Sequence, residues 1–493
     1  MDTIVAEERV SDHPMVINGE LVQSSAGLSD PVINPATGEV FDYVPHGTRE
    51  DLDRAVDAAT EAFKTWSVTP FAERAACMLK FAELVDASKE KLAKAMTMEQ
   101  GKPLANSIGE VMGLIGKCHE SANPELELTS ETVSEDDDAE YKIVYQPRGV
   151  IGGITPWNFP LLMAANKLLP SVSTGNTVVV KPSPYTPLAT VMLSEMAAEA
   201  FPAGVMNIMT GGDELGQMMV EHPKIAQISF TGSAATGKKI MATGAATLKK
   251  VTLELGGNDP AIILPDADIA DVAPKIFAGA MMNTGQVCVA IKRVFVHEDK
   301  YEEMVQAMAA QAAKALPTFN DGLKEGTRFG PINNRMQLAR VSELVEDAKA
   351  SGARVVAGGK TFNPNGANGF FYEPTVLADV QEGVRIVDEE QFGPVIPLMK
   401  YSTIDEALER ANATDFGLGG SVWTNDLAKG AEIAAKIQSG MRGVNAHPGG
   451  GPNTPFGGIK QSGIGVEGAG KLGLKEFVDV TTLRIAKVGL SKK

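Results

Sequence analysis

A thiol, a carboxylate and a side-chain amide stand out in this sequence as a set that could do chemistry. Cys288 closes the turn GQVC (Gly285–Cys288), Glu254 ends an apolar run, and Asn158 lies in the segment TPWNFP. A thiolate is a nucleophile, a carboxylate can act as a general base, and an amide N–H can stabilise an oxyanion. The three residue types would therefore supply a nucleophile, a base and an oxyanion donor.

Each of the three also has a simpler interpretation. A free cysteine is usually a small buried hydrophobic residue, and the helix-like contexts of Cys77 and Cys118 fit that description well. Alternation along residues 251–255 places Glu254 opposite the apolar side chains, so it could face solvent, although a carboxylate at the C-terminal edge of a covered parallel strand lies where α/β active sites form. Asn158 could cap the helix that follows it.

Two series of alternating elements must position these residues. In the first, segments 149–154, 177–180, 205–209, 225–230 and 250–255 are predicted strands, and segments 161–174, 188–200, 213–221 and 234–245 are predicted helices between them. This rhythm predicts right-handed βαβ units and a buried parallel sheet. Strands at 261–264, 293–297, 354–357, 395–399 and 421–424 predict a second α/β domain that begins just after Glu254.

The flanking segments are predicted from end signals and composition. A hairpin is expected over 15–22, a helix over 52–66 that starts at Thr48 with Asp51, and a long amphipathic stretch over 71–98 that stops at Gly101. The acidic segment 125–140 is interpreted as a solvated loop rather than an interaction tail. The β-rich segments 141–145 and 477–485 could pair as an extension that contacts another subunit.

A glycine turn after the fourth predicted strand nearly matches a phosphate loop. Residues 228–239 read ISFTGSAATGKK, and the pattern GxxxxGK[ST] fails only at Lys239, which replaces the magnesium-binding hydroxyl. A nucleoside triphosphatase is therefore excluded. A turn of Gly232 and Ser233 that opens a helix still offers backbone N–H groups to a phosphate. The dinucleotide fingerprint GxGxxG is absent, so the sheet alone does not predict nicotinamide binding.

Composition excludes several function classes. The 493 residues exceed one ordinary core, and 44% hydrophobic with 22% charged residues is typical of a soluble globular protein. A net charge of −17 disfavours non-specific nucleic-acid binding. Three cysteines argue against a disulfide framework, and neither they nor the six histidines show zinc-ligand spacing, so no metal is expected. No signal peptide or membrane-spanning run is visible, so a cytoplasmic location is expected.

Taken together, the motifs resemble the aldehyde dehydrogenase superfamily over nearly the whole chain. Their number, order and spacing make the resemblance specific. They are INPATGE (33–39), TPWNFP (155–160), KPS (181–183), FTGS (230–233), LELGG (253–257), GQVC (285–288), EQFGPV (390–395) and PFGGIKQSG (455–463).

The resemblance implies a fold and a domain division. It implies two Rossmann-like parallel-sheet domains, one cofactor-binding and one catalytic, plus a small β oligomerisation extension. The implied dinucleotide-binding domain covers 1–124 and 147–254, the catalytic domain covers 255–473, and the extension covers 125–146 and 474–493. A homodimer or homotetramer is implied as well.

The implied reaction is oxidation of an aldehyde to a carboxylic acid with NAD(P)+. In it Cys288 resembles the nucleophile, Glu254 the general base and Asn158 the oxyanion donor, so that a thiohemiacetal and a thioester form in turn. Two alternatives stay open: a CoA-acylating semialdehyde dehydrogenase, against which Glu254 counts, and a non-catalytic structural protein on the same fold. The aldehyde itself is not identified.

The resemblance also implies the binding residues. Those similar to cofactor-binding residues are Thr155, Trp157, Lys181, Gly232, Ser233, Leu255, Glu390 and Phe392. NAD is expected, with NADP as the alternative because Pro184 replaces a glutamate that bonds the ribose hydroxyls in many NAD-using members. Asn166 stands where many members carry an aromatic residue, which predicts a more polar or wider substrate channel. The candidate channel walls are Phe159, Met163, Asn166, Val287, Val289 and Phe456.

Overall fold

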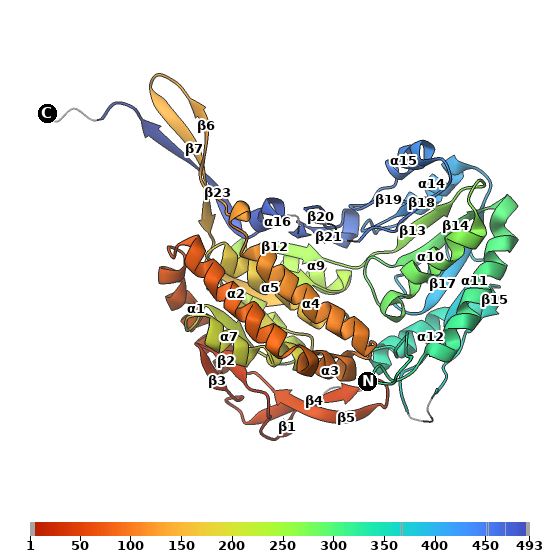
Figure 1. Cartoon of the computed structure of the whole chain (residues 1–493), viewed down its shortest axis with the longest axis horizontal. Helices are drawn as coiled ribbons and strands as arrows, with labels where there is room; N and C mark the ends of the chain where they lie inside the picture. Colours follow the sequence, from red (N-terminus) through yellow and green to blue (C-terminus); the bar gives the residue numbers. More distant parts are fainter. Residues whose placement is uncertain are drawn as a thin grey trace.

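Two largely parallel sheets, each covered by helices, organise the computed structural model of the chain (Figure 1). The structure describes residues 5–364, 366, 368–449, 451, 453–468 and 470–489. Residues 1–4 and 490–493, at the ends of the predicted N-terminal domain and of the predicted extension, lie outside the described residues. The predicted α/β fold with two parallel sheets is confirmed, and each predicted strand matches an observed strand to within about two residues.

The first sheet has eight strands in the order β21-β12-β11-β8-β9-β10-β2-β3. Its five central strands are parallel, and their order places β8 in the middle, with later strands added first on one side and then on the other. The central strands are β8 (Val150–Ile154), β9 (Thr177–Lys181), β10 (Met206–Ile208), β11 (Ile225–Thr231) and β12 (Lys250–Glu254); the edge strands are β2 (Met15–Ile17), β3 (Glu20–Val22) and β21 (Gly463–Ile464).

Strand β21 joins this sheet from far along the chain. It pairs antiparallel with β12, with Glu254 opposite Gly463. This segment therefore lies beside the first sheet, although the predicted domain division groups it with the second.

Helices cover both faces of the first sheet because its strands are buried on both sides. Helix α1 (Arg49–Trp66) begins at a capping box of Thr48 and Asp51, as its sequence signals predict. The other helices are α2 (Phe71–Ala87), α3 (Lys89–Gln100), α4 (Leu104–Ser121), α5 (Pro160–Ser173), α6 (Leu188–Val191), α7 (Ser194–Ala200), α8 (Asp213–Glu221) and α9 (Ala234–Gly244).

Two predicted helical segments are each divided in the structure. The stretch 71–98 is broken at Ser88 into α2 and α3, and the stretch 188–200 is broken into α6 and α7. The predicted stop at Gly101 is confirmed, since its φ of 97° is the left-handed conformation that glycine adopts at helix ends. Periodicity locates such segments, but a single-residue break leaves the apolar pattern almost unchanged.

The second sheet has seven strands in the order β15-β16-β17-β14-β13-β18-β19, and only the pairing of β15 with β16 is antiparallel. Its strands are β13 (Asp259–Ile263), β14 (Ile291–His297), β15 (Arg354–Ala357), β16 (Thr375–Ala378), β17 (Val395–Tyr401), β18 (Ser421–Trp423) and β19 (Gly443–Val444). Its helices are α10 (Ile269–Met281), α11 (Tyr301–Ala315), α12 (Arg335–Ala350), α13 (Arg385–Asp388), α14 (Ile404–Asn412) and α15 (Leu427–Ala434).

Three small sheets complete the described chain. One contains β1 (Glu7–Glu8), β4 (Leu28–Asn34) and β5 (Glu39–Pro45). A second pairs β20 (Pro455–Phe456) with β22 (Glu467–Gly468), which is followed by α16 (Lys471–Lys475). The third, the extension, contains β6 (Glu131–Glu135), β7 (Ala139–Pro147) and β23 (Val478–Ala486).

The extension projects away from both sheets at the upper left of Figure 1. Strands β7 and β23 pair antiparallel from Val478 with Pro147 to Ala486 with Ala139, so the predicted pairing of the two β-rich segments is confirmed. The interpretation of 125–140 as a loop is wrong for Glu131–Glu135, which forms strand β6 on β7. The acidic residues gave no sign of this strand because all five of its side chains face solvent.

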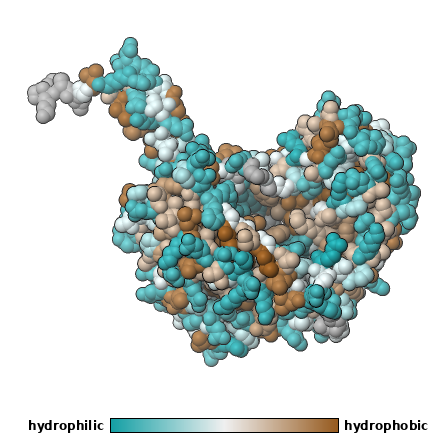
Figure 2. Space-filling model, in the orientation of Figure 1, coloured by the Kyte–Doolittle hydropathy of each residue, from teal (hydrophilic) through white to brown (hydrophobic). Residues whose placement is uncertain are grey.

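The surface between the two sheets is hollowed, as Figure 2 shows above the centre of the molecule. Among the described residues, no helix is long and apolar enough to cross a membrane. No three His, Cys, Asp or Glu side chains of the described segments gather where they could hold a metal ion.

Candidate active site

The candidate residues gather where the carboxyl ends of the first sheet face the start of the second. Asn158 follows β8, Lys181 ends β9, Gly232 follows β11 and Glu254 ends β12. The crevice beyond the carboxyl ends, where the strand order reverses, is the usual ligand site of open α/β sheets. Cys288 reaches this junction from a turn that directly precedes β14.

The turn that carries Cys288 has an irregular backbone. Asn283, Thr284 and Gly285 have φ values of 48°, 59° and 75°, which is a left-handed run that costs energy for residues with a side chain. Gly285 is required here, because a Cβ at that position would lie 2.2 Å from the carbonyl oxygen of Gly393. The side chain of Gln286 holds the turn, accepting from the N–H of Asn333 at 2.8 Å.

Asn158 is fastened to the same turn. Its Nδ2 donates to the carbonyl oxygen of Gln286 at 3.0 Å, and its own carbonyl accepts from Asn283 Nδ2 at 3.1 Å. The interpretation of Asn158 as a helix cap is wrong, because Phe159 occupies the N-cap of α5 and no side chain caps it. An amide nitrogen carries two N–H groups, so one remains for a ligand oxygen.

A buried ion pair that sequence reasoning missed supports Asn158 from behind. Lys102 donates to the Asn158 carbonyl at 2.8 Å and to Glu110 Oε2 at 2.5 Å, and both charged side chains are almost fully buried. Glu110 Oε1 in turn accepts from the N–H groups of Leu161 and Leu162 at the start of α5. In the sequence Lys102 gives only the signal of a helix end, because its contact with Asn158 joins segments 56 residues apart.

Glu254 is buried rather than exposed, with only 2% of its surface accessible. Neither of its carboxylate oxygens has a hydrogen-bond partner among the described residues. Burial raises its pKa well above the usual value, and the Glu467 carboxylate raises it further, while Lys167 lowers it. A carboxyl group with a raised pKa and free lone pairs is suited to taking a proton from a neighbouring group.

Glu467 and Lys167 form a second buried pair that the sequence did not indicate. Their side chains are ion-paired with almost no exposure, and Lys167 also donates to Thr231 Oγ1 at 2.7 Å. Their charges affect the pKa of Glu254, although Lys167 lies in a helix and Glu467 lies more than 200 residues beyond Glu254 in the sequence.

The thiol of Cys288 is surrounded by apolar walls and carboxylates. Val287 and Val289 form a buried cluster with Ala290, Leu418 and Met441, and Cys288, Phe159 and Phe456 pack against it. Burial raises the pKa of the Cys288 thiol to about 12; Lys292 lowers this pKa, and Glu390, Glu254 and Asp259 raise it. Cys77 and Cys118 lie in helices α2 and α4, as expected for structural cysteines.

Lys181 and Thr155 offer donors at the open end of the first sheet. Lys181 is buried and donates to the carbonyl oxygens of Pro182 and Gly211 at 3.0 and 3.1 Å, and burial lowers its pKa to about 8. The buried hydroxyl of Thr155 has no hydrogen-bond partner within the described residues. An ammonium with a third N–H and an unpaired hydroxyl fit a polar ligand such as a ribose.

Glu390 lies on the opposite side of the crevice, before β17. Its Oε1 accepts from the N–H of Gly257 at 3.1 Å and is 3.3 Å from Lys292 Nζ. The ring of Phe392 meets the ring of Trp157 edge to face, with centroids 5.2 Å apart. Three of the predicted cofactor residues therefore come together across the two sheets.

The predicted phosphate turn opens a helix, as expected. Ser233 is the N-cap of α9 and accepts from the N–H of Thr236, while the N–H of Gly232 donates to the Glu254 carbonyl at 3.0 Å. Leu255 is buried and packs on α9, where a Cβ on Gly237 would lie 2.7 Å from its side chain. The exposed N-terminus of α9 can therefore accept a phosphate, with Leu255 supporting the helix.

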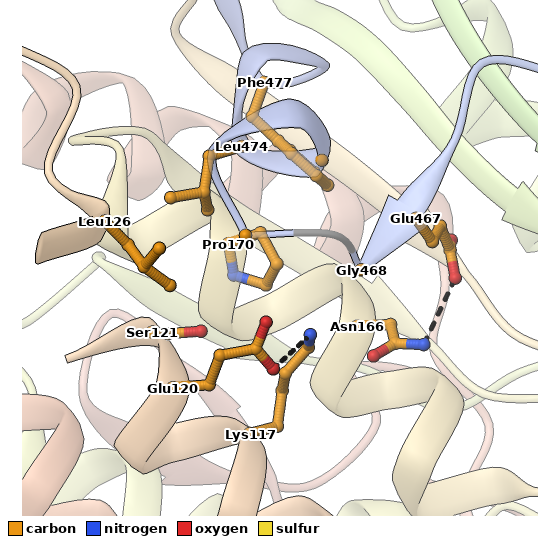
Figure 3. Close-up of a pocket in the computed structure, with 12 residues that line it drawn as sticks. Lys117, Glu120, Ser121, Leu126, Asn166, Pro170, Glu467, Gly468, Leu474 and Phe477 are labelled. Carbon is orange, nitrogen blue, oxygen red and sulfur yellow. Dashed lines mark hydrogen bonds and ion pairs between the residues drawn. The ribbon is translucent and has the colours of Figure 1, made fainter. Parts of the chain in front are cut away.

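Asn166 and Met163 lie on the same half-buried stripe of α5, and Asn166 lines a pocket. Its Nδ2 donates to Glu467 Oε2 at 3.2 Å (Figure 3). This pocket lies between α4, α5 and the C-terminal segment; apart from Asn166, none of the predicted channel walls lines it. Phe159, Val287, Val289 and Phe456 share the cluster beside Cys288 instead.

Comparison with known proteins gives consistent matches along the chain. The model of the aldehyde dehydrogenase family matches residues 22–483. An aldehyde dehydrogenase of Enchytraeus buchholzi is 38% identical over 98% of this chain and 97% of its own length. The mitochondrial succinate-semialdehyde dehydrogenase of Arabidopsis thaliana is 38% identical over 94% of this chain and 88% of its own.

A solved structure agrees with these sequences. The NAD+ complex of aldehyde dehydrogenase from Bacillus cereus superposes with a TM-score of 0.93 at 36% identity, covering 96% of both chains.

The close packing at Gly257 predicts the effect of a single methyl group. A Cβ there would lie 2.6 Å from the Cys288 carbonyl oxygen and 2.7 Å from Asp259 Oδ1, so Gly257→Ala should destabilise the protein by ~1–3 kcal/mol through overpacking. Urea unfolding followed by fluorescence measures this loss. The control is Gly116→Ala in α4, where a Cβ meets nothing within 4 Å and should stabilise the helix slightly. Equal stabilities for the two variants would contradict the packing account.

Proposed function

Because the chain belongs to the aldehyde dehydrogenase family and is an NAD(P)-dependent enzyme that oxidises an aldehyde to the acid, we propose that Cys288, Glu254 and Asn158 carry the reaction. The observation that supports these roles most directly is the bond from Asn158 Nδ2 to the carbonyl of Gln286 in the Cys288 turn. This bond supports the assignment because it joins the proposed oxyanion donor to the turn that carries the proposed nucleophile. The unpaired, buried carboxylate of Glu254 supplies the base.

The first step is attack of Cys288, as the thiolate, on the aldehyde carbon. A bond forms between Sγ and that carbon, and the carbonyl electron pair moves onto the aldehyde oxygen. The second N–H of Asn158 donates to the developing oxyanion, a contribution typically worth about 10²–10³ in rate. The apolar cluster of Val287, Val289 and Phe456 limits water around the sulfur.

When bound, NAD(P)+ supplies a hydride acceptor, and loss of the hydride leaves a thioester on Cys288. Glu254 then takes a proton from a water molecule as the water oxygen attacks the thioester carbon. The carbon–sulfur bond breaks, the acid is released and the thiolate of Cys288 is restored. The raised pKa of Glu254 fits this role, because a base is most effective when its pKa lies near the working pH.

The residues that would hold the cofactor are those predicted from the resemblance. Lys181 and Thr155 fit the adenosine ribose and nearby polar groups, Gly232 and Ser233 fit the pyrophosphate, and Glu390 fits the second ribose. Trp157 and Phe392 flank the nicotinamide position, and Leu255 backs the helix that faces the phosphates. The unpaired Thr155 hydroxyl and the spare N–H of Lys181 support this assignment.

The domain division and the surroundings of the reaction are part of the same proposal. We assign cofactor binding to the unit built on the first sheet and the nucleophile to the unit built on the second. Three cysteines without a disulfide suit the reducing cytoplasm. Semialdehydes are one candidate substrate class, because a relative of similar length is named for one. Asn166 and Met163 are kept as candidate channel residues.

Substitution of the proposed nucleophile and base separates the two chemical steps. We expect Cys288→Ala to abolish aldehyde-dependent cofactor reduction, and Glu254→Gln to keep one rapid turnover while steady-state turnover falls at least ~10²-fold. In the wild type, turnover should rise with pH through the raised pKa of Glu254, since the carboxylate form is the base. Stopped-flow absorbance measures both phases.

The control for these rates is Cys77→Ala, in a helix away from the site. Activity that survives in Cys288→Ala, or turnover that requires added CoA, would contradict the hydrolytic assignment.

Cofactor preference is predicted from Pro184. With no carboxylate there to repel a 2′-phosphate, the wild type should use both NAD and NADP, with NAD preferred. We expect Pro184→Glu to lower kcat/KM for NADP about tenfold or more while leaving NAD use within a few-fold, because like charges repel at close range. Initial rates with both cofactors measure this ratio. An unchanged ratio would show that residue 184 does not face the ribose.

We also propose that the extension forms a homodimer or homotetramer contact. It exposes four large apolar side chains that a monomer would leave in water: Val133, Val480, Leu483 and Ile485. They lie on the projecting strands β6 and β23.

Sedimentation velocity tests this contact. The wild type should sediment as a dimer or tetramer, and Leu483→Asp combined with Ile485→Asp should shift it to a smaller species. Met336→Asp, at an exposed apolar position on α12 away from the extension, should leave the sedimenting species unchanged. A monomeric wild type, or an unchanged double variant, would refute the proposed contact.

A further inference from the structure

Lys292 is a buried cation that none of the proposed catalytic steps uses. It is the second residue of β14, directly after the turn that carries Cys288, and 2% of its side chain is exposed. Its Nζ turns back onto that turn, donating to the carbonyl oxygens of Val287 at 2.8 Å and Cys288 at 2.6 Å. The side chain therefore binds the peptide groups immediately before and after Cys288.

The third donor of the same ammonium faces a carboxylate. Lys292 Nζ lies 3.3 Å from Glu390 Oε1, which also accepts from the N–H of Gly257. An ammonium has three N–H groups, so all three have an acceptor. Through this one group the Cys288 turn, the loop after Glu254 and the loop before β17 are joined.

Neighbouring side chains cannot replace this cation. Arg293 is adjacent in sequence, but its guanidinium donates to the carbonyl oxygens of Asn258, Arg410 and Ala411 instead. Charges that bear on the Cys288 thiol come from four elements: Glu254 on β12, Asp259 on β13, Glu390 before β17 and Lys292 on β14. Three are carboxylates and Lys292 is the cation of the set.

We propose that Lys292 is a positioning residue for the nucleophile, holding the Cys288 turn through two carbonyl groups and supplying the positive charge that favours the thiolate among three carboxylates. The proposal rests on the role of Cys288 proposed above. The direction of the charge effect agrees with the geometry, because Lys292 lowers the pKa of the thiol and each carboxylate raises it. Since the thiolate is the reactive form, this charge bears directly on attack.

Alkylation of Cys288 as a function of pH tests the charge effect without cofactor or aldehyde. The rate of iodoacetamide addition to the Cys288 peptide would be followed by mass spectrometry between pH 6 and 10 in the full-length protein. We expect Lys292→Met to slow the reaction about tenfold throughout this range, because the whole range lies below the thiol pKa of about 12, where one pKa unit is a tenfold change in thiolate.

Two further variants separate charge from shape. Lys292→Arg keeps the charge and should keep the alkylation rate close to that of the wild type, while its fork should hold the two carbonyls less well and lower kcat. Lys275→Met removes an exposed lysine that pairs with Asp271 and should leave the titration unchanged.

A second pair of variants controls for loss of folding. Lys292→Met leaves Glu390 buried without its cation, so the double variant Lys292→Met/Glu390→Gln should be compared with Glu390→Gln alone. The double variant is expected to be alkylated more slowly between pH 6 and 10, because it lacks the lysine charge that favours the thiolate.

The inference is wrong if both lysine-deficient proteins are alkylated as fast as their parents, or if Lys292→Arg slows alkylation as much as Lys292→Met does. Failure of the proposed function gives a different result: Cys288→Ala would keep aldehyde oxidation, whatever the lysine variants do to the thiol.

Discussion

The loop Gly256–Gly257 between the two sheets is the constraint on which the site depends. It connects β12, which ends in Glu254, directly to β13, so the proposed base and the unit that carries the proposed nucleophile are only a few residues apart in the chain. A Cβ on Gly256 would lie 2.0 Å from Glu390, and one on Gly257 would lie 2.6 Å from the Cys288 carbonyl. Only a backbone without side chains allows the three segments to meet.

That close approach brings several charged side chains together between the two sheets. Lys102 with Glu110 and Lys167 with Glu467 are buried pairs, Lys292 with Glu390 is a largely buried one, and each touches a backbone or side chain of the candidate site. Buried pairs are often worth little to stability, because desolvation offsets their attraction. Their value here is in positioning: each fixes a carbonyl, a helix start or a carboxylate next to Asn158, Glu254 or Cys288. Removing one partner would leave a buried charge beside the chemistry.

Much of the fold followed from the sequence because parallel strands are apolar on both faces and helices are periodic. Strands β8, β9, β11 and β12 were predicted to within two residues for this reason. The break at Ser88 and the strand Glu131–Glu135 were not, since one leaves the periodicity intact and the other buries no side chain. Local sequence patterns indicate only which side chains are buried and where helices and strands end.

The sequence predicts the three candidate catalytic residues, but it does not predict the buried lysines that lie next to them. Cys288, Glu254 and Asn158 lie in recognisable motifs, whereas Lys102, Lys167 and Lys292 each have at least one partner far along the chain: Asn158, Glu467 and Glu390. Asn166 shows the same limit, because its position on α5 was predictable but its bond to Glu467 was not. Long-range pairing of charged groups is decided by the packed structure alone.

The central claim is that the reaction passes through a thioester on Cys288 that Glu254 helps to hydrolyse. Intact-protein and peptide mass spectrometry of Glu254→Gln, mixed with NAD+ and an oxidisable aldehyde and quenched in acid, tests this claim most directly. We expect an acyl adduct on the Cys288 peptide, with a mass two units below that of the adduct formed by simple addition of the aldehyde. No adduct, or an adduct on another residue, would contradict it.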